Sequence, residues 1–117
     1  MTKLYTYSGC STCKKAKRFL DKNNITYKEL AIRETPPSKT ELKKMLKSVH
    51  GEIRKLFNTS GQDYRTLNIK DKLPDINENE AIDLLATNGN LIKRPVLISD
   101  KGILVGYKEE TWKDMLF

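Results

Sequence analysis

The sequence predicts an α/β fold in which a β-α-β unit and a β-β-α unit flank a helical segment. Three observations lead to this prediction. Residues 3–7 alternate and are rich in strand-forming residues, and a helical apolar spacing begins shortly after them. An apolar run at 96–98 is followed by a short turn and a second apolar run at 103–105. The region between these two ends has helical spacing and a helix-capping pattern.

The length and composition favour one ordinary globular domain. At 117 residues a chain buries roughly two-thirds of its surface on folding, enough for a core without metal or disulfide support. Hydrophobic residues make up 38% and glycines number only 6, which excludes disordered and collagen-like chains. We therefore expect a single domain over 1–117, with a core of about 1–34 and 91–117 and a helical insertion of about 35–90.

Charge and hydropathy limit the cellular compartments and the classes of partner that the sequence predicts. The net charge of +7 is compatible with an anionic ligand, an acidic protein or a nucleic acid. Lysines are nevertheless interspersed with acidic residues, and no nucleic-acid-binding motif is present. No apolar stretch has the length of a secretory signal or of a membrane span. We expect a cytoplasmic protein, monomeric and without membrane contact, whose thiols are kept reduced.

The first thirty residues predict the β-α-β unit. Ser8 and Gly9 interrupt the strand at 3–7, and a polar stop ends the helix that follows. A second strand is expected over 25–32, and the helical crossover makes the two strands parallel. The apolar face of the helix comprises Ala16, Phe19 and Leu20.

The middle of the chain predicts helices. Ser38 and Glu41 form a capping-box pattern that begins one helix, and Gly51 ends it. Three further segments follow: a short helix at about 52–57, a stretch around 64–69 that receives no assignment, and a helix at about 77–87.

The end of the chain predicts the β-β-α unit. The apolar runs at 96–98 and 103–105 are expected to form an antiparallel hairpin. A last helix is expected over 108–116, and Tyr107 and Trp112 should pack this helix onto the sheet.

The chemistry-bearing motif is Cys10-Ser11-Thr12-Cys13, which lies at the turn between the first strand and its helix. Backbone N–H groups and the positive end of the helix dipole favour a thiolate at this position. A CxxC motif in such a unit is typical of thioredoxin-like redox proteins. We therefore predict a thioredoxin-like fold in which Cys10 is the nucleophile and Cys13 resolves the mixed disulfide.

Two other interpretations of the cysteines stay open. Both could be unreactive buried thiols. They could instead be half of a metal site, but a tetrahedral zinc site needs four ligands and the chain has a single histidine, His50, as a further soft ligand. We expect neither a metal nor a bound cofactor.

Arg94 and Pro95 directly precede the apolar strand at 96–98. By itself this pair indicates only a helix stop and a surface cation. In thioredoxin-like proteins, however, the loop that enters this strand carries a cis proline facing the reactive cysteine, so the predicted fold brings Arg94 to the same edge. An arginine beside a thiolate stabilises it or holds an oxyanion.

The motifs together resemble those of the glutaredoxin-coupled arsenate reductase superfamily, which includes the redox-responsive regulator Spx. The similar stretches cover nearly the whole chain and are residues 4–6, 10–17, 36–38 with 41–42, 91–95 and 105–110. The resemblance implies a thioredoxin-like core with an inserted helical segment and a cis peptide before Pro95. It also implies that Cys10 is the nucleophile with Arg94 near it, and that glutathione with glutaredoxin, or thioredoxin, is the reductant.

Three positions of the sequence bear on whether the protein reduces arsenate. Asn58 and Gly106 stand where the arsenate reductases carry arginines, and the loss of two cations predicts weak arsenate binding. Cys13 instead resembles the second cysteine of the Spx redox pair. The leading prediction is a thiol-disulfide reductase of this family with an unknown substrate.

The alternative prediction is a redox-sensing transcription regulator. It follows from the resemblance of Gly51 to a glycine with which Spx contacts the C-terminal domain of the RNA polymerase α subunit.

Overall fold

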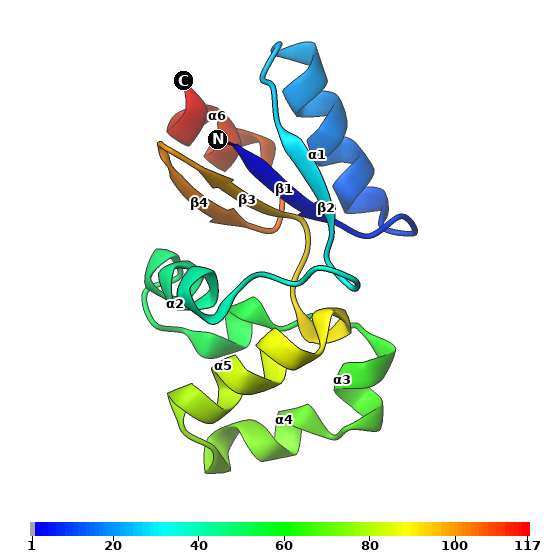
Figure 1. The fold of residues 1–117 in the computed structure, drawn as a ribbon, viewed down its shortest axis with the longest axis vertical. Helices are drawn as coiled ribbons and strands as arrows, with labels where there is room; N and C mark the ends of the chain where they lie inside the picture. The colour runs from blue at the N-terminus through cyan, green and yellow to red at the C-terminus, as the bar shows by residue number, and fades with distance from the viewer. Residues whose placement is uncertain (1) are drawn as a thin grey trace.

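A four-stranded mixed sheet organises the protein. The computed structural model describes residues 2–117. The strands β1 (Lys3–Thr6), β2 (Lys28–Ala31), β3 (Val96–Ser99) and β4 (Gly102–Val105) lie in the order β2-β1-β3-β4. The first pair is parallel and the other two pairs are antiparallel, as a β-α-β unit joined to a hairpin requires. Figure 1 shows this sheet in the upper half of the molecule.

One face of the sheet is covered by α1 (Ser11–Lys22) and α6 (Glu109–Leu116). Their buried side chains meet in one cluster with the strand residues that point to that face: Leu4, Ala16, Phe19, Leu20, Leu97, Trp112 and Leu116. The ring of Phe19 lies edge-on to those of Tyr107 and Trp112. The predicted packing of the last helix through Trp112 is therefore confirmed.

The other face carries the helices between β2 and β3. They are α2 (Lys39–Ser48), the 3-10 helix η1 (Ile53–Leu56), α3 (Gln62–Thr66), α4 (Ile69–Lys72), η2 (Leu73–Asp75), α5 (Glu78–Thr87) and η3 (Gly89–Leu91). Tyr5 and Val96 point to this second cluster, whereas their neighbours Leu4 and Leu97 point to the first. This alternation is the two-residue period of a strand with both faces covered.

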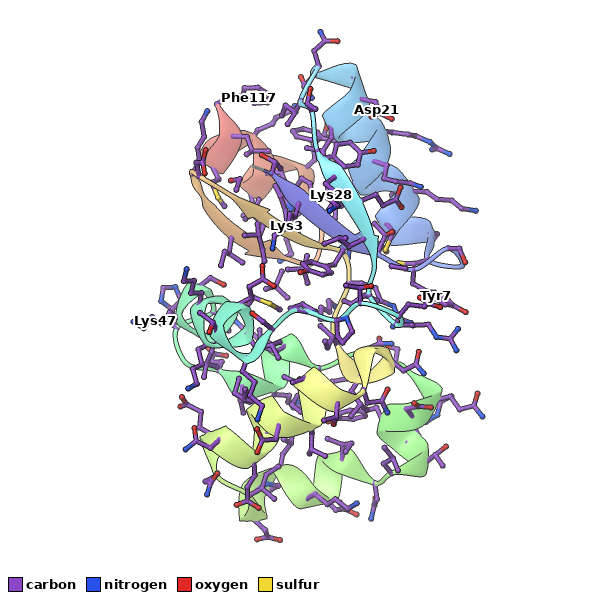
Figure 2. All side chains as sticks on the ribbon, viewed as in Figure 1. Lys3, Tyr7, Asp21, Lys28, Lys47 and Phe117 are labelled. Atoms are coloured by element: carbon purple, nitrogen blue, oxygen red, sulfur yellow. The ribbon has the colours of Figure 1, made fainter. Side chains whose placement is uncertain are left out.

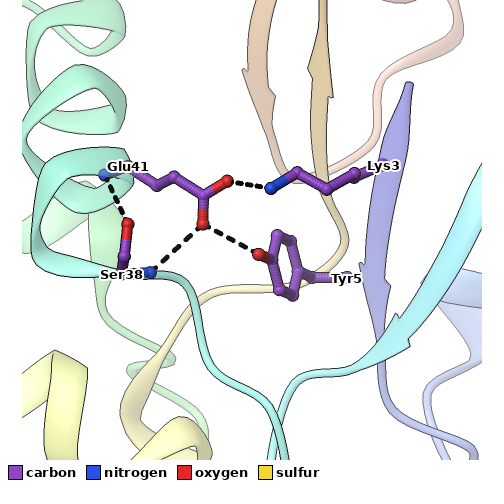
Figure 3. A network of polar contacts seen from close by, with 4 residues as sticks. All are labelled: Lys3, Tyr5, Ser38 and Glu41. Atoms are coloured by element: carbon purple, nitrogen blue, oxygen red, sulfur yellow. Dashed lines mark hydrogen bonds and ion pairs between the residues drawn. The ribbon is translucent and has the colours of Figure 1, made fainter. Parts of the chain in front are cut away.

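A polar network joins α2 to the sheet (Figure 3). The carboxylate of Glu41 forms an ion pair with Lys3 and accepts hydrogen bonds from the Tyr5 hydroxyl at 2.8 Å and the Ser38 amide at 3.1 Å. Burial opposes ionisation of Glu41, but the hydrogen bonds from Lys3, Tyr5 and Ser38 prevail and lower its pKa. Burial and the bond to Glu41 raise the pKa of Tyr5. The capping box predicted for Ser38 and Glu41 is present, and the same glutamate also fastens the insertion to β1.

The architecture is a thioredoxin-like α/β fold with an inserted helical segment, as predicted. The second strand is shorter than the expected 25–32, because residues 25–27 lead into β2 without joining the sheet. The unassigned stretch around 64–69 forms α3 and the start of α4. No helix within residues 2–117 has the length and apolar character needed to cross a membrane.

Candidate functional site at the N-terminus of α1

Cys10 occupies the N-cap of α1. Its backbone is extended, with φ −93° and ψ 112°, and its Sγ accepts a hydrogen bond from the Cys13 amide at 3.3 Å. The Cys10 amide donates to the Tyr7 carbonyl oxygen at 3.0 Å, which closes the loop between β1 and α1. A sulfur in this position takes the place of a capping oxygen and receives the unpaired N–H groups of the first turn. The side chain is half-buried, so a small reagent can reach it.

Cys13 is more buried than Cys10, and its pKa is raised. It lies one turn into α1 with only 1% of its surface exposed. Burial and a hydrogen bond to Cys10 raise the pKa of Cys13 to about 12, although a hydrogen bond from the Tyr7 backbone and the charge of Arg94 act in the opposite direction. Cys13 is therefore a neutral thiol at physiological pH and can donate to Cys10.

Arg94 and Pro95 reach the same edge of the sheet from the start of β3. The peptide bond between them is cis, and Pro95 is buried. The guanidinium carbon of Arg94 lies over the Tyr7 ring, 4.8 Å from its centroid. The charge of Arg94 lowers the pKa of Cys13. The structure thus places Cys10, Cys13 and Arg94 at one edge of the sheet, with the cis Pro95 directly after Arg94.

Tyr7 and Arg33 also belong to this edge, and the sequence analysis did not identify them. Arg33 lies over the same ring, with its guanidinium carbon 5.1 Å from the centroid and its Nη1 donating to the Tyr7 hydroxyl at 3.3 Å. A usable signal was present: Tyr7 ends one of the two strands predicted to be parallel and Arg33 follows the other, and the carboxyl ends of parallel strands share an edge.

Asn58 and Gly106 form backbone hydrogen bonds with the segment that carries Arg94. The Asn58 amide donates to the Leu91 carbonyl at 2.7 Å, and the Gly106 amide donates to the Pro95 carbonyl at 2.7 Å. A Cβ at position 106 would lie 3.4 Å from Cε of Lys93. The stem of Lys93 therefore passes close to Gly106.

A groove of about 760 Å³ lies between η1 and the β4–α6 connection. Four cations, Arg54, Lys55, Lys93 and Lys108, line it together with one carboxylate, that of Glu52, and with His50 among uncharged residues. His50 lies two residues beyond α2 with a positive φ of 58°, at the groove and not at the thiols. Gly51 follows it on the surface, with φ 80° and open space where a side chain would begin.

Comparison with known proteins adds the family context. The sequence matches the model of the ArsC family over residues 5–115. It is 43% identical over 110 residues to the uncharacterized protein YusI of Bacillus subtilis, covering 94% of this chain and 93% of that protein. It is 32% identical over 111 residues to the global transcriptional regulator Spx of Listeria innocua, covering 94% of this chain and 82% of that protein. A solved structure from Streptococcus mutans, described as a possible arsenate reductase, matches with a TM-score of 0.87 at 40% identity over 97% of this chain and 98% of that one.

Proposed function

The chain belongs to the ArsC family, and from this membership and the geometry of the two cysteines we propose that it is a thiol-disulfide reductase. Cys10 is the nucleophile, Cys13 is the resolving thiol, and Arg94 stabilises the thiolate or a bound anion. The proposed setting is the cytoplasm, where reductants keep the dithiol available.

One observation carries the proposal: the two sulfurs have opposite environments. Cys10 is accessible and its Sγ accepts the Cys13 N–H at 3.3 Å, whereas Cys13 is buried with its pKa raised to about 12. An attacking thiol must be reachable and able to carry negative charge, while a resolving thiol must stay protonated until the first step is complete. This asymmetry favours a division of roles over two equivalent buried thiols.

In the first step the Cys10 thiolate attacks one sulfur of a disulfide substrate. A bond forms between Cys10 Sγ and that sulfur, the substrate S–S bond breaks, and the other half leaves as a thiolate that takes up a proton from water. The hydrogen bond from the Cys13 amide in the first turn of α1 holds the attacking sulfur in place.

In the second step Cys13 gives its proton to water and attacks Cys10 Sγ. The Cys10–Cys13 bond forms, the bond between Cys10 Sγ and the substrate sulfur breaks, and the second half of the substrate leaves as a thiolate that takes up a proton, so that two electrons have passed from the protein to the substrate. Two molecules of glutathione, acting with glutaredoxin, or one molecule of the dithiol thioredoxin then return two electrons and two protons to the pair.

Coupled turnover assays test this function. Bis(2-hydroxyethyl) disulfide and arsenate are offered with each reductant system, and NADPH consumption is followed. The rate of each reductant system alone, which itself reduces the disulfide, is subtracted. Above this background we expect turnover by the wild type and by Ser8→Ala, an exposed residue of the same loop, and none by Cys10→Ser. An excess over background that survives in Cys10→Ser, or no excess by the wild type with any reductant, contradicts the proposal. We also expect arsenate to be the poorer substrate, because Asn58 and Gly106 provide no guanidinium groups.

A second candidate function is a redox-sensing regulator that binds the C-terminal domain of the RNA polymerase α subunit. Two observations favour it: the 32% identity to Spx and the exposure of Gly51 beside the cationic groove. In this function the Cys10–Cys13 disulfide changes a binding surface and no substrate is turned over.

Binding measurements with the purified α-subunit domain distinguish the two functions. The regulator predicts binding that differs between the reduced and oxidised protein and that is lost in Gly51→Arg, with Lys72→Glu on α4 as a surface control. If the reduced and oxidised proteins bind the α-subunit domain equally and the protein turns over a disulfide, the regulator function is contradicted and the reductase function is supported.

A further inference from the structure

We propose that Arg33 and Arg94, held together on the ring of Tyr7, bind a carboxylate of the disulfide substrate beside Cys10. The inference rests on the proposed reductase function and names its substrate class: disulfides with a carboxylate within a few bonds of the sulfur. Arg33 and Arg94 contact the substrate, and Tyr7 is a positioning residue.

The topology puts these three residues at the edge of the sheet that carries Cys10. Tyr7 directly follows β1 and Arg33 lies just beyond β2, its parallel neighbour. Arg94 precedes β3, which runs antiparallel to β1. The ends of β1 and β2 and the beginning of β3 therefore share one side of the sheet. Figure 2 shows Tyr7 at this edge, below the start of α1.

The Tyr7 ring connects the two cations to the cysteine loop. Both guanidinium groups lie over it, at 5.1 Å for Arg33 and 4.8 Å for Arg94. A Cβ at Gly9 would lie 2.9 Å from Cε2 of the ring, so the ring is packed against the residue before Cys10. The backbone carbonyl of Tyr7 also accepts the Cys10 N–H at 3.0 Å. The ring against which both arginines lie is therefore packed on the loop that carries the attacking sulfur.

The two arginines are further anchored to one turn, η3. A Cβ at Gly89 would lie 2.0 Å from the Ile32 carbonyl oxygen and 2.8 Å from Cα of Arg33, so this turn is packed directly against the backbone that carries Arg33. The Asn90 carbonyl accepts a hydrogen bond from Nη1 of Arg94 at 3.5 Å. The backbone of Arg33 and the guanidinium group of Arg94 are thus held in place by η3. Less conformational entropy of the two side chains is then lost when a ligand binds.

No acidic side chain within residues 2–117 forms a recorded ion pair with either arginine of this pair. Two cations against one ring repel each other, and a bound carboxylate would relieve the repulsion. The planar guanidinium fork suits the two oxygens of a carboxylate. The pair therefore favours an anionic group, and the edge of the sheet that it shares with the cysteine loop favours one carried by the substrate.

Three small disulfides of different charge test the inference. They are 3,3′-dithiodipropionate with two carboxylates, neutral bis(2-hydroxyethyl) disulfide, and cystamine with two ammonium groups. The second-order rate constant for mixed-disulfide formation at Cys10 is measured by quenched mass spectrometry in Cys13→Ser, which isolates the first step. Each value is divided by that of a free thiol with the same disulfide, which removes the intrinsic reactivity of the reagents.

We expect the normalised rate constant to be largest for the dicarboxylate and smallest for cystamine. Arg33→Ala should lower the ratio of dicarboxylate to neutral rate constants by about threefold to tenfold, as expected for a largely exposed ion pair. Arg33→Glu should lower this ratio further. Lys47→Glu is the control, because it makes the same charge change on α2, far from Tyr7 (Figure 2), and it should leave the ratio unaltered. Tyr7→Phe keeps the aromatic ring, so its ratio should stay close to that of the parent. Tyr7→Ala removes the ring, so its ratio should fall.

The outcomes separate the inference from the function on which it rests. If Cys10 reacts with the neutral disulfide but the ratio is the same in Arg33→Ala and the parent, the carboxylate site is wrong and the reductase function stands. If Lys47→Glu lowers the ratio as much as Arg33→Glu, overall charge and not this site sets the preference, and the inference also falls. If Cys10 reacts with none of the three disulfides, the function and the inference fall together.

Discussion

The backbone amide of Cys13 donates a hydrogen bond to the Sγ of Cys10 at 3.3 Å. This contact exists because Cys10 is the N-cap of α1 and Cys13 is the third residue of the helix, which is the spacing at which a capping side chain meets an unpaired N–H. The CxxC spacing thereby places one sulfur at the helix end and buries the other one turn inside.

The protonation of Cys13 gives the first prediction. In Cys10→Ser the bond to Cys10 is lost but burial, the larger cause, stays, so the pKa of Cys13 remains well above the ordinary value of about 8.5. Its alkylation by iodoacetamide should therefore still rise steeply with pH between about 8 and 10. A plateau in the rate at or below the ordinary thiol pKa would contradict the burial of a neutral Cys13.

The charge of Arg94 gives the second prediction. Because this charge lowers the pKa of Cys13, Arg94→Met should raise that pKa and reduce the thiolate fraction available for the resolving step. We expect release of the second substrate half from the mixed disulfide to slow by about threefold to tenfold at neutral pH. Arg94→Lys, which keeps a cation, should recover part of the rate. Equal rates in all three proteins would show that Arg94 does not act on the thiols.

The carboxylate of Glu41 gives the third prediction. Glu41→Gln removes the ion pair with Lys3 and weakens the bonds from Tyr5 and Ser38, so the free energy of unfolding should fall by about 1–3 kcal/mol at pH 7. The folded-state pKa of Glu41 is lowered, so its contribution is complete above its unfolded pKa of about 4.3 and is lost as the pH falls through the folded value.

Urea unfolding of wild type and Glu41→Gln at several pH values provides the measurement. The difference between them should shrink as the pH falls below about 4. Glu110→Gln, an exposed carboxylate on α6, should change stability by less than about 0.5 kcal/mol. A difference that does not depend on pH would contradict an ionised Glu41 in the folded protein.

The close contact at Gly89 gives the fourth prediction. Gly89→Ala places a methyl group 2.0 Å from the Ile32 carbonyl oxygen, where backbone must shift, and we expect a loss of about 2–4 kcal/mol. Gly51→Ala has open space around it but a φ of 80°, so the cost should be only about 1 kcal/mol. Thermal or chemical unfolding compares the two variants. Similar losses would mean that η3 does not press on the end of β2.

Much of the fold follows from local patterns in the sequence. The alternation in β1, the capping box at Ser38 and the apolar hairpin near the end of the chain each specify an element through its own side chains. The stretch around 64–69 escaped prediction because α3 and α4 are only 5 and 4 residues long, too short for a helical period to show. The residues at 25–27 are strand formers and were therefore predicted as strand, but they pair with no strand among residues 2–117.

Only part of the site can be predicted from the sequence. The cysteine pair carries its own signature, and Arg94 and Pro95 become meaningful once the fold is known. Tyr7 and Arg33 have no local signature, because an arginine after a strand is by default a solvated cation. Only the meeting of β1, β2 and β3 at one edge gives these two residues a shared role.

Intact-mass spectrometry of the reduced protein after brief exposure to bis(2-hydroxyethyl) disulfide tests the division of roles between the cysteines most directly. The account predicts that the wild type loses two hydrogen atoms by forming the Cys10–Cys13 disulfide. Cys13→Ser should retain one mercaptoethanol adduct, and Cys10→Ser should stay unmodified. An adduct on Cys10→Ser that forms as fast as that on Cys13→Ser, or a wild type that gains adducts without closing the disulfide, would contradict the account.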